Sequence, residues 1–221
     1  MGRALVAWVV LASGSAAAVN LSSFSDYEVS GRAADGTAYV GALSVLTMGK
    51  VHRMTWEAGD RPEGFGLRVG EALAVAVGEG CGVTGYRIDA AGGLQGSWLA
   101  PVYPQAGNQL GAETATRAAG SAGLSGDYGV KGTLPDGRPY EGALTIRQAG
   151  MQWRFSWRTD REVEGVGIAR GGYVAVAWGA SECGVMLYRV AADGSLAGIW
   201  KDPGERIGVE WTSAPVPAVR E

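Results

Sequence analysis

The 221-residue sequence predicts an all-β protein made of two tandem antiparallel meander β-barrels, each with seven or eight strands. Three observations support this fold class. The chain contains an internal repeat, apolar residues recur at every second position, and 37 glycines with several Asp-Gly pairs supply tight turns. No segment after residue 18 shows the spacing of an amphipathic helix.

The internal repeat divides the chain into two copies. Residues 26–80 align with residues 127–181 without a gap, and residues 81–101 align with residues 183–203. A unit of roughly 90 residues is too long for a solenoid, whose repeats have about 20 to 50 residues, so each copy is predicted to form a small domain. We expect copy 1 at 25–115, a linker at 116–124, copy 2 at 125–213 and a C-terminal tail at 214–221.

Alternation at a period of two indicates corresponding strands in the two copies. It is seen at residues 39–45 and 140–146, at 52–56 and 153–157, and at 73–77 and 174–178. Such spans are typical of half-buried antiparallel strands. Type I′ hairpin turns are predicted at Asp35-Gly36, Asp136-Gly137 and Asp193-Gly194. Short connections favour a meander, and a meander of eight strands can close into a barrel.

The first 18 residues have the layout of a secretory signal peptide. One basic residue, Arg3, precedes an apolar run at 4–11, and small residues lead to an expected cleavage site near Ala18. The run is too short for a transmembrane helix, which needs about 20 apolar residues. We therefore expect an exported protein, periplasmic or extracellular, with no membrane insertion after the signal is cleaved.

The two cysteines, Cys81 and Cys183, occupy equivalent positions in the two copies. An exported protein meets oxidising conditions, so the pair is a candidate disulfide. If the copies pack about a pseudo-twofold axis, equivalent positions meet near that axis, and the bond would join the copies. The alternative is two buried free thiols that pack as small apolar side chains.

The acidic residues allow a structural and a catalytic interpretation. In the structural one, each acid pairs with an arginine on a neighbouring strand, giving two ion pairs: Arg53 with Glu63, and Arg154 with Glu164. In the catalytic one, the protein is a carboxylate-based hydrolase with two acid and base pairs: Glu63 with Glu113, and Glu164 with Glu210.

Other signals of catalysis or metal binding are weak. The single histidine, His52, corresponds to Trp153 in copy 2 and is predicted to be a packing residue. One histidine and two separated cysteines do not provide the ligand spacing of a zinc site. We expect no catalytic residue, no metal site and no cofactor.

Six tryptophans are candidate ligand-binding residues: Trp56, Trp98, Trp153, Trp157, Trp178 and Trp200. Small-molecule sites are commonly lined by aromatic side chains. The alternative is core filling, because small barrels are packed with alternating large and small side chains. Copy 2 contains additional tryptophans, so we expect it to hold the ligand site if there is one.

Short motifs recur in one order along both copies: DYxVxGxxxDGxxYxGAL, EGxG, CGVxxYR, GxLxGxW and GxE. This order resembles a group of small exported bacterial proteins that often carry the name "fibronectin-binding protein". The resemblance covers residues 26–212, implies an adhesion role, and carries over no catalytic residue. The strand and turn rhythm that ends in Leu-x-Gly-x-Trp is also similar to calycin and avidin-like barrels, without a pattern for a biotin site.

The sequence therefore predicts a non-enzymatic exported binding module with two β-domains. Its partner is expected to be a small apolar molecule, a glycan or an extracellular protein. The alternative is a structural, envelope-interaction or adhesion protein without a soluble ligand. The net charge of −3 and the scattered basic residues predict no nucleic-acid partner.

Overall fold

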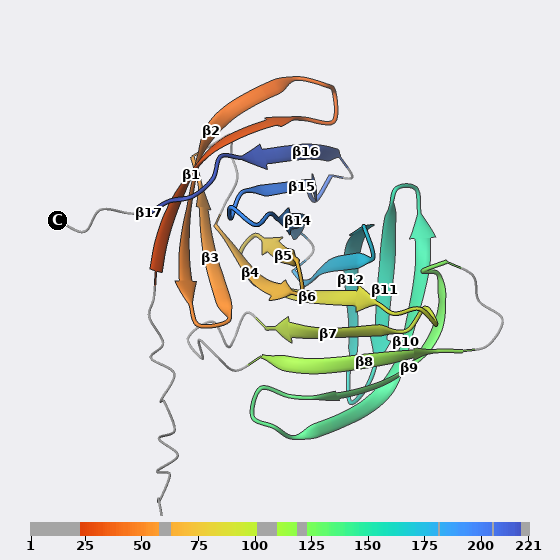
Figure 1. The fold of residues 1–221 in the computed structure, drawn as a ribbon. Coiled ribbons are helices and arrows are strands. Elements are labelled where there is room, and N and C mark those ends of the chain that lie inside the picture. The colour runs from red at the N-terminus through yellow and green to blue at the C-terminus, as the bar shows by residue number, and fades with distance from the viewer. Residues whose placement is uncertain are drawn as a thin grey trace, which may run out of the picture.

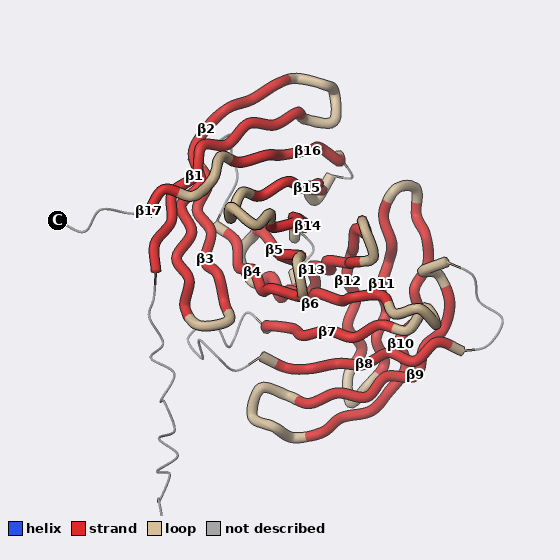
Figure 2. The backbone as a smooth tube through the Cα atoms, viewed as in Figure 1, coloured by secondary structure: helices blue, strands red, loops and turns tan. Residues whose placement is uncertain are grey.

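The computed structural model describes residues 23–57, 63–100, 110–118, 123–180, 182–204 and 206–217. These residues form strands, turns and loops, and they contain no helix of the length and apolarity needed to cross a membrane (Figure 2). The strands build two closed eight-stranded antiparallel barrels that lie side by side (Figure 1). This arrangement confirms the predicted fold class. The predicted signal peptide, residues 1–18, lies outside the described residues.

One barrel, called the terminal barrel here, contains the strands from both ends of the chain. Its last strand, β16, pairs with residues 29–32 of β1 and closes the barrel, while β17 (Val216–Pro217) pairs with β1 at Ser25 and Asp26. The strands in order around the barrel are β1 (Ser23–Arg32), β2 (Ala38–Met48), β3 (Val51–Trp56), β4 (Gly64–Val69), β5 (Ala72–Val77), β14 (Gly184–Val190), β15 (Leu196–Lys201) and β16 (Ile207–Thr212).

The other barrel, the central barrel, is continuous in sequence and lies between β5 and β14. Its last strand, β13, pairs with β6 to close it. The strands in order are β6 (Cys81–Ile88), β7 (Leu94–Leu99), β8 (Gly111–Arg117), β9 (Gly126–Thr133), β10 (Pro139–Ala149), β11 (Gln152–Arg158), β12 (Glu162–Arg170) and β13 (Tyr173–Gly179).

The barrels do not coincide with the two copies of the repeat. Copy 1 holds β1 to β8 and copy 2 holds β9 to β16, so five strands of each barrel come from one copy and three from the other. Figure 1 shows orange and blue strands together in the terminal barrel. The strand order thus corrects the expectation that each copy forms a domain of its own.

The predicted linker and tail also take part in the barrels. β8 and β9 are neighbours in the central barrel, and Arg117 pairs with Tyr128, so residues 116–117 belong to a strand rather than to a linker between domains. Residues 119–122 lie outside the described residues. In the predicted tail, Val216 pairs with Asp26 on β1.

The strands are exchanged at two equivalent positions, where the chain passes between the barrels. Strand β5 pairs with β14 and strand β13 pairs with β6, although β6 and β14 are equivalent in sequence. Two glycines follow β5 with left-handed backbones, Gly78 at a φ of 122° and Gly80 at 71°, and Gly179, which is equivalent to Gly78, ends β13 at a φ of 109°. Such backbones suit glycine, and they occur at both passages between the barrels.

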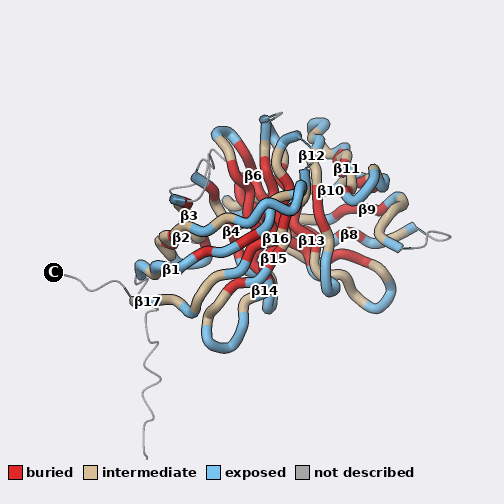
Figure 3. Tube along the Cα trace, turned by 90° about the horizontal axis from the view of Figure 1, so that it is seen from above, coloured by how far each residue is buried: buried red, intermediate tan, exposed pale blue. Residues whose placement is uncertain are grey.

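Three apolar clusters stabilise the molecule, one inside each barrel and one between the barrels. In β5 the residues Leu73, Val75 and Val77 face the interior of the terminal barrel, whereas Ala72 and Ala74 belong to the cluster between the barrels. Buried residues gather where the barrels meet (Figure 3). Alanine on this outer face lets the two sheets approach closely, because its side chain occupies little space.

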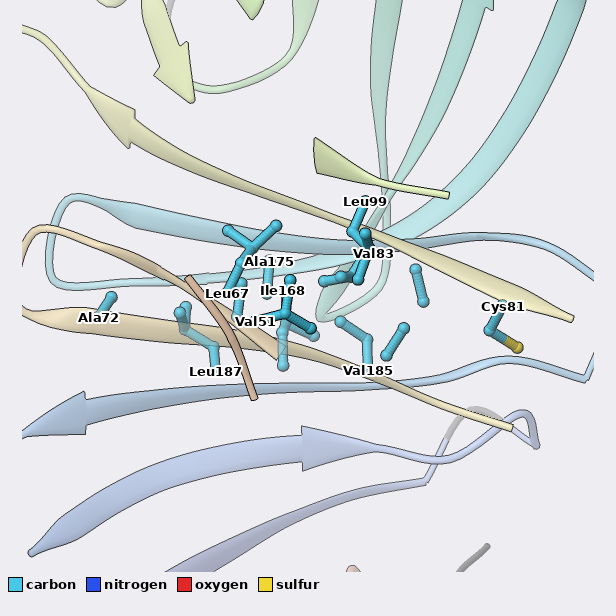
Figure 4. Packing of buried hydrophobic residues seen from close by; sticks show 13 residues of the cluster. Val51, Leu67, Ala72, Cys81, Val83, Leu99, Ile168, Ala175, Val185 and Leu187 are labelled. Atoms are coloured by element: carbon cyan, nitrogen blue, oxygen red, sulfur yellow. The ribbon is translucent and has the colours of Figure 1, made fainter. Parts of the chain in front are cut away.

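The cluster between the barrels contains larger side chains from both of them. Leu67 and Leu187 come from the terminal barrel, and Val83, Leu99 and Ile168 come from the central barrel (Figure 4). Strands that are apolar on both faces are buried on both sides. The two barrels therefore share a core and form one packed body.

A disulfide bond joins Cys81 to Cys183, with the Cα atoms 5.7 Å apart. Cys81 begins β6 of the central barrel, and Cys183 immediately precedes β14 of the terminal barrel. The bond therefore links the two positions at which the chain passes between barrels. The predicted disulfide is confirmed, and the alternative of two free thiols is excluded.

The Asp-Gly pairs form hairpin turns, although not of the predicted type. A hydrogen bond from the N–H of Gly36 to the carbonyl of Ala33 closes the first turn, so Gly36 is the fourth residue of the turn. Its φ is 86°. In a type I′ turn, glycine would be one of the two central residues. The observed turns instead place glycine where the following strand begins, with Asp35 accepting a hydrogen bond from the N–H of Thr37.

Candidate ligand pocket in the central barrel

The interior of the central barrel contains a buried acidic side chain, Glu113. It occupies an inward-facing position on β8, and only 6% of its surface is exposed. Its Oε1 accepts hydrogen bonds from the hydroxyl of Tyr86 and from Nε1 of Trp157, the latter at 3.0 Å. Its Oε2 accepts one from the hydroxyl of Tyr140 at 2.7 Å. An ionised carboxylate only accepts hydrogen bonds, so this set of donors matches it.

Burial and the carboxylate keep the two tyrosines protonated. The pKa of Tyr86 lies well above its usual value, first because the phenol is buried and then because Glu113 is negatively charged. The same two causes, in the same order, raise the pKa of Tyr140. Both hydroxyls are therefore hydrogen-bond donors at neutral pH.

Two further tryptophans extend the hydrogen bonding toward the mouth of the barrel. Trp98 donates from Nε1 to the hydroxyl of Tyr140 at 3.0 Å, and Trp178 donates from Nε1 to Oγ1 of Thr84 at 2.9 Å. The ring of Trp98 is inclined by 70° to that of Trp178 and by 68° to that of Tyr140, with centroids 6.0 and 6.4 Å away. These edge-to-face contacts hold the rings of Trp98, Trp178 and Tyr140 against one another in the wall of the barrel.

A pocket of ≈ 310 Å³ opens onto this network. The residues that line it include Trp98, Trp157 and Trp178, and the carboxylate Glu113. Small-molecule sites have volumes of about 300 to 1,000 Å³, so the pocket suits a ligand of modest size. The site is therefore a concave aromatic surface with one acidic group at its buried end.

Glycines opposite the aromatic rings provide the space that these rings occupy. A Cβ atom on Gly132 would overlap the ring of Tyr140, and one on Gly111 would overlap the ring of Trp98. Gly111 lies on β8, the strand of Glu113, and Gly132 lies on the neighbouring strand β9. The repeated GxLxGxW and GxE motifs are thus part of the packing around the carboxylate.

The terminal barrel contains the same network without the same pocket residues. Glu210 is fully buried and accepts hydrogen bonds from the hydroxyl groups of Tyr39 and Tyr188 and from Nε1 of Trp56. The position equivalent to Trp178 is occupied by Val77. The buried carboxylate is therefore common to both barrels, whereas the tryptophan at the mouth is specific to the central barrel.

No family model, curated protein or solved structure matches this chain. The kind of ligand that the pocket binds is therefore inferred from the side chains that line it.

The six candidate tryptophans are divided between three environments. Trp98, Trp157 and Trp178 line the pocket of the central barrel. Trp56 and Trp200 belong to the network of the terminal barrel, in which Trp200 donates to the hydroxyl of Tyr39 at 3.0 Å. Trp153 is partly buried against the core of the central barrel and is not among the pocket residues. The pocket thus combines residues of both copies.

One of the two predicted ion pairs is present among the described residues. Arg53 contacts Glu63 through two nitrogens, with Nη2 at 2.6 Å from Oε2, and both side chains are 46% exposed. No described ion pair joins Arg154 to Glu164; on adjacent strands, Arg154 lies opposite Val166 and Glu164 lies opposite Ser156.

The predicted carboxylate pairs do not form. Glu63 belongs to the terminal barrel and Glu113 to the central barrel, while Glu164 belongs to the central barrel and Glu210 to the terminal barrel. The two members of each proposed pair therefore belong to different barrels. This pairing is wrong because the chain passes from one barrel to the other between the two members of each pair.

His52 lies on β3 of the terminal barrel, away from the pocket. A hydrogen bond of 3.0 Å joins its Nδ1 to Oγ1 of Thr47. Its pKa is lowered to about 4, mainly because the ring is buried and secondarily because Arg68 is nearby. The ring is therefore neutral at pH 7 and takes part in packing and local hydrogen bonding.

Sequence reasoning named the glutamates and tryptophans of the carboxylate networks without connecting them. The two copies share the glutamate, both tyrosines and both tryptophans at equivalent positions, which is the signal that indicates a common interior. Further residues that line the pocket, among them the buried Thr84 and the exposed Asp160 and Arg161, were not predicted. Among the described residues, no group of three or more His, Cys, Asp or Glu side chains is arranged to hold a metal ion.

Proposed function

We propose that the protein is an exported, non-enzymatic binding protein whose ligand site is the pocket of the central barrel. The observation that carries this proposal is the pocket itself, in which three tryptophans surround access to a buried carboxylate. Sites for small molecules typically combine aromatic walls with a few polar groups in defined positions. The ≈ 310 Å³ of space suits a ligand rather than a single trapped water.

The hydrogen bonding around the pocket supports binding rather than catalysis. The polar hydrogens of Tyr140, Trp98 and Trp178 are already donated to protein acceptors. Such a wall is rigid, because each ring is held by a hydrogen bond as well as by packing. A hydrolase would instead need a second carboxylate or a base beside Glu113. The predicted partner Glu63 is in the other barrel, and the other carboxylate that lines the pocket, Asp160, is 82% exposed and contacts Arg161.

The proposal of export rests on two features. Residues 1–18 have the layout of a signal peptide, and the chain contains the Cys81–Cys183 disulfide. Disulfides persist in oxidising compartments such as the bacterial periplasm and the extracellular space.

Tryptophan fluorescence and calorimetry of the mature protein test the binding function. The protein is titrated with a panel of small apolar molecules, envelope glycans and fibronectin. We expect saturable binding by a small molecule that weakens at least tenfold in Trp178→Val, which introduces the residue of the terminal barrel at the equivalent position. A folded protein with no response to any member of the panel contradicts the proposal.

An adhesion or envelope-interaction role is the second candidate, and a groove between the barrels favours it. The groove has a volume of ≈ 440 Å³ and is lined in part by Tyr173, Arg170, Arg189 and Trp211. Trp211 is 45% exposed, which is unusual for so large an apolar side chain. If this role is correct, Trp211→Ser weakens binding of a protein or glycan from the panel and leaves small-molecule binding unchanged.

A further inference from the structure

Among the residues that the structure describes, the buried charge of Glu113 in the central barrel has no cationic partner. Glu113 is 6% exposed, and none of the ion pairs between described residues includes it. Its hydrogen-bond donors Tyr86, Tyr140 and Trp157 are all neutral. Buried charges in proteins are normally paired with an opposite charge. A ligand that entered the pocket with a positive charge would supply that partner.

The hydrogen-bond capacity that remains at the carboxylate of Glu113 is acceptor capacity. A carboxylate offers about four positions for donors, and Glu113 uses two on Oε1 and one on Oε2. The hydroxyl of Tyr140 and the indole nitrogens of Trp98 and Trp178 already donate to protein atoms. A ligand group that reaches Glu113 therefore has to bring a hydrogen-bond donor, and Oε2 of Glu113 is the position that can receive it.

The aromatic walls favour the same ligand chemistry. An ammonium group is attracted to the faces of tryptophan and tyrosine rings, and the attraction increases when water is excluded. Trp98, Trp157 and Trp178 line the cavity, and the nearly perpendicular rings of Trp98 and Trp178 enclose it from two directions. The one basic lining residue, Arg161, lies on the exposed rim, where its Nε is 3.8 Å from Oδ1 of Asp160.

We propose that the pocket binds an organic ammonium ion, namely a protonated primary amine attached to an apolar group. The ammonium group donates a hydrogen bond to Oε2 of Glu113, and the apolar group packs among Trp98, Trp157 and Trp178. An anionic ligand is disfavoured, because it would meet the uncompensated charge of Glu113 in a water-poor interior. This inference rests on the proposed binding function and specifies the class of its ligand.

Three small probes with similar phenyl bodies test the ligand class on the unmodified protein. Phenethylamine is cationic at pH 7, 2-phenylethanol is neutral, and 3-phenylpropanoate is anionic. Their dissociation constants are measured by calorimetry and by quenching of tryptophan fluorescence. We expect the amine to bind at least tenfold more tightly than the alcohol, and the carboxylate to bind more weakly than either.

Matched variants locate the effect at one carboxylate. Glu113→Gln is expected to bring the affinity for phenethylamine down to that for 2-phenylethanol, while the affinity for the alcohol stays within about twofold, that is, a change of less than RT ln 2. Glu210→Gln changes the equivalent side chain in the terminal barrel and is expected to alter neither affinity. Circular dichroism establishes that both variants are folded. If Glu113→Gln does not fold, the comparison of the three probes on the unmodified protein still decides the ligand class.

The outcomes separate the ligand class from the binding function. If the alcohol or the carboxylate binds as tightly as the amine, and Trp178→Val weakens that binding, the pocket is a binding site but the ammonium class is wrong. The class is equally wrong if none of the three probes binds while another small molecule of the panel does. If no small molecule binds at all, both the inference and the proposed pocket function fail.

Discussion

Glu113 and Trp157 belong to different copies of the repeat, yet a 3.0 Å hydrogen bond joins them inside one barrel. The same relationship holds in the terminal barrel, where Glu210 of copy 2 accepts a hydrogen bond of 3.1 Å from Trp56 of copy 1. Each interior is therefore completed only when strands of both copies combine. This dependence leads to predictions about stability that do not require knowledge of the ligand.

Replacing the buried carboxylate by an apolar residue should be costly. In Glu113→Leu, the hydroxyls of Tyr86 and Tyr140 and the indole of Trp157 lose their acceptor inside the barrel. Each unsatisfied buried donor costs about 1 to 3 kcal/mol, so we expect the free energy of unfolding in urea to fall by more than about 3 kcal/mol. Tyr140→Phe removes one donor and should lower it by only about 1 to 2 kcal/mol.

An exposed glutamate provides the control for this measurement. Glu141 lies on the same strand as Tyr140, and its side chain is 71% exposed in a surface ion pair with Lys131. Glu141→Gln should change the free energy of unfolding by less than about 0.5 kcal/mol. An equal loss in Glu113→Leu and Glu141→Gln would show that the buried network contributes nothing specific.

The disulfide should stabilise the fold substantially. Cys81 and Cys183 are separated by 102 residues, and cross-links that close loops of this length stabilise proteins by about 2 to 5 kcal/mol. We expect the double variant Cys81→Ser/Cys183→Ser to lose a comparable amount of unfolding free energy while its far-ultraviolet circular dichroism is retained, because the apolar cluster between the barrels remains. Reductant should destabilise the natural protein and leave the double variant unaffected; the opposite pattern contradicts this account.

The strand order predicts which fragment of the chain folds alone. Residues 81–179 contain all eight strands of the central barrel and close through the pairing of β6 with β13. Residues 25–115, which form one copy of the repeat, lack β14 and β13, which pair with the second edges of β5 and β6. We expect cooperative thermal unfolding of a monomer for the fragment 81–179 carrying Cys81→Ser, and not for the fragment 25–115.

Cooperative unfolding of the fragment 25–115 would instead show that the strands of one copy can pair among themselves. If the fragment 25–115 were a monomer with cooperative unfolding, β5 would have to pair with β6 in the same copy. The exchange of strands in the intact protein would then reflect the linkage of the two copies. Sedimentation analysis distinguishes such a monomer from a dimer of two copies.

Stability should decrease in mild acid because of His52. The pKa of this residue is lowered from 6.5 to about 4 in the folded protein, mainly by burial. Above pH 6.5 the ring is neutral in both states; between pH 6.5 and 4 the unfolded chain binds a proton that the folded protein does not, so the free energy of unfolding falls. The shift corresponds to at most about 3 kcal/mol, and below pH 4 the loss from this residue is complete.

Urea denaturation at pH 7 and pH 4.5 tests this pH dependence. The natural protein should lose more unfolding free energy between the two pH values than His52→Gln, which has no titrating ring. The size of the difference measures the contribution of His52 separately from that of the carboxylates. Equal losses in the two proteins would show that another group dominates the acid response.

Much of the local structure followed from the sequence. Alternation at a period of two located strands such as β2 and β10, and the repeat aligned Cys81 with Cys183, which are bonded in the structure. The turn positions were also correct, whereas the turn type at Gly36 was not. Local patterns identify strands and turns because backbone preference and one-sided burial act over a few residues.

The assignment of strands to barrels could not be predicted in the same way. Residues 81–88 and 183–190 are identical at five of eight aligned positions, so the local pattern does not show which of β6 and β14 pairs with β5. Pairing energy depends on opposed side chains and on register, and the strand pattern is the same for the two partners. For the same reason the carboxylate pairs predicted from the sequence were assigned to the wrong neighbours.

The sequence by itself determined that this protein is all-β and duplicated and that its two cysteines are equivalent, because those features depend on short-range patterns and on equivalent positions in two copies. Only the tertiary structure decided that each barrel contains both copies and that Glu113 meets three tryptophans in one pocket. The face of β5 that carries Ala72 and Ala74 is buried against strands of the central barrel. This packing joins segments that lie far apart along the chain, so no short-range pattern in the sequence specifies it.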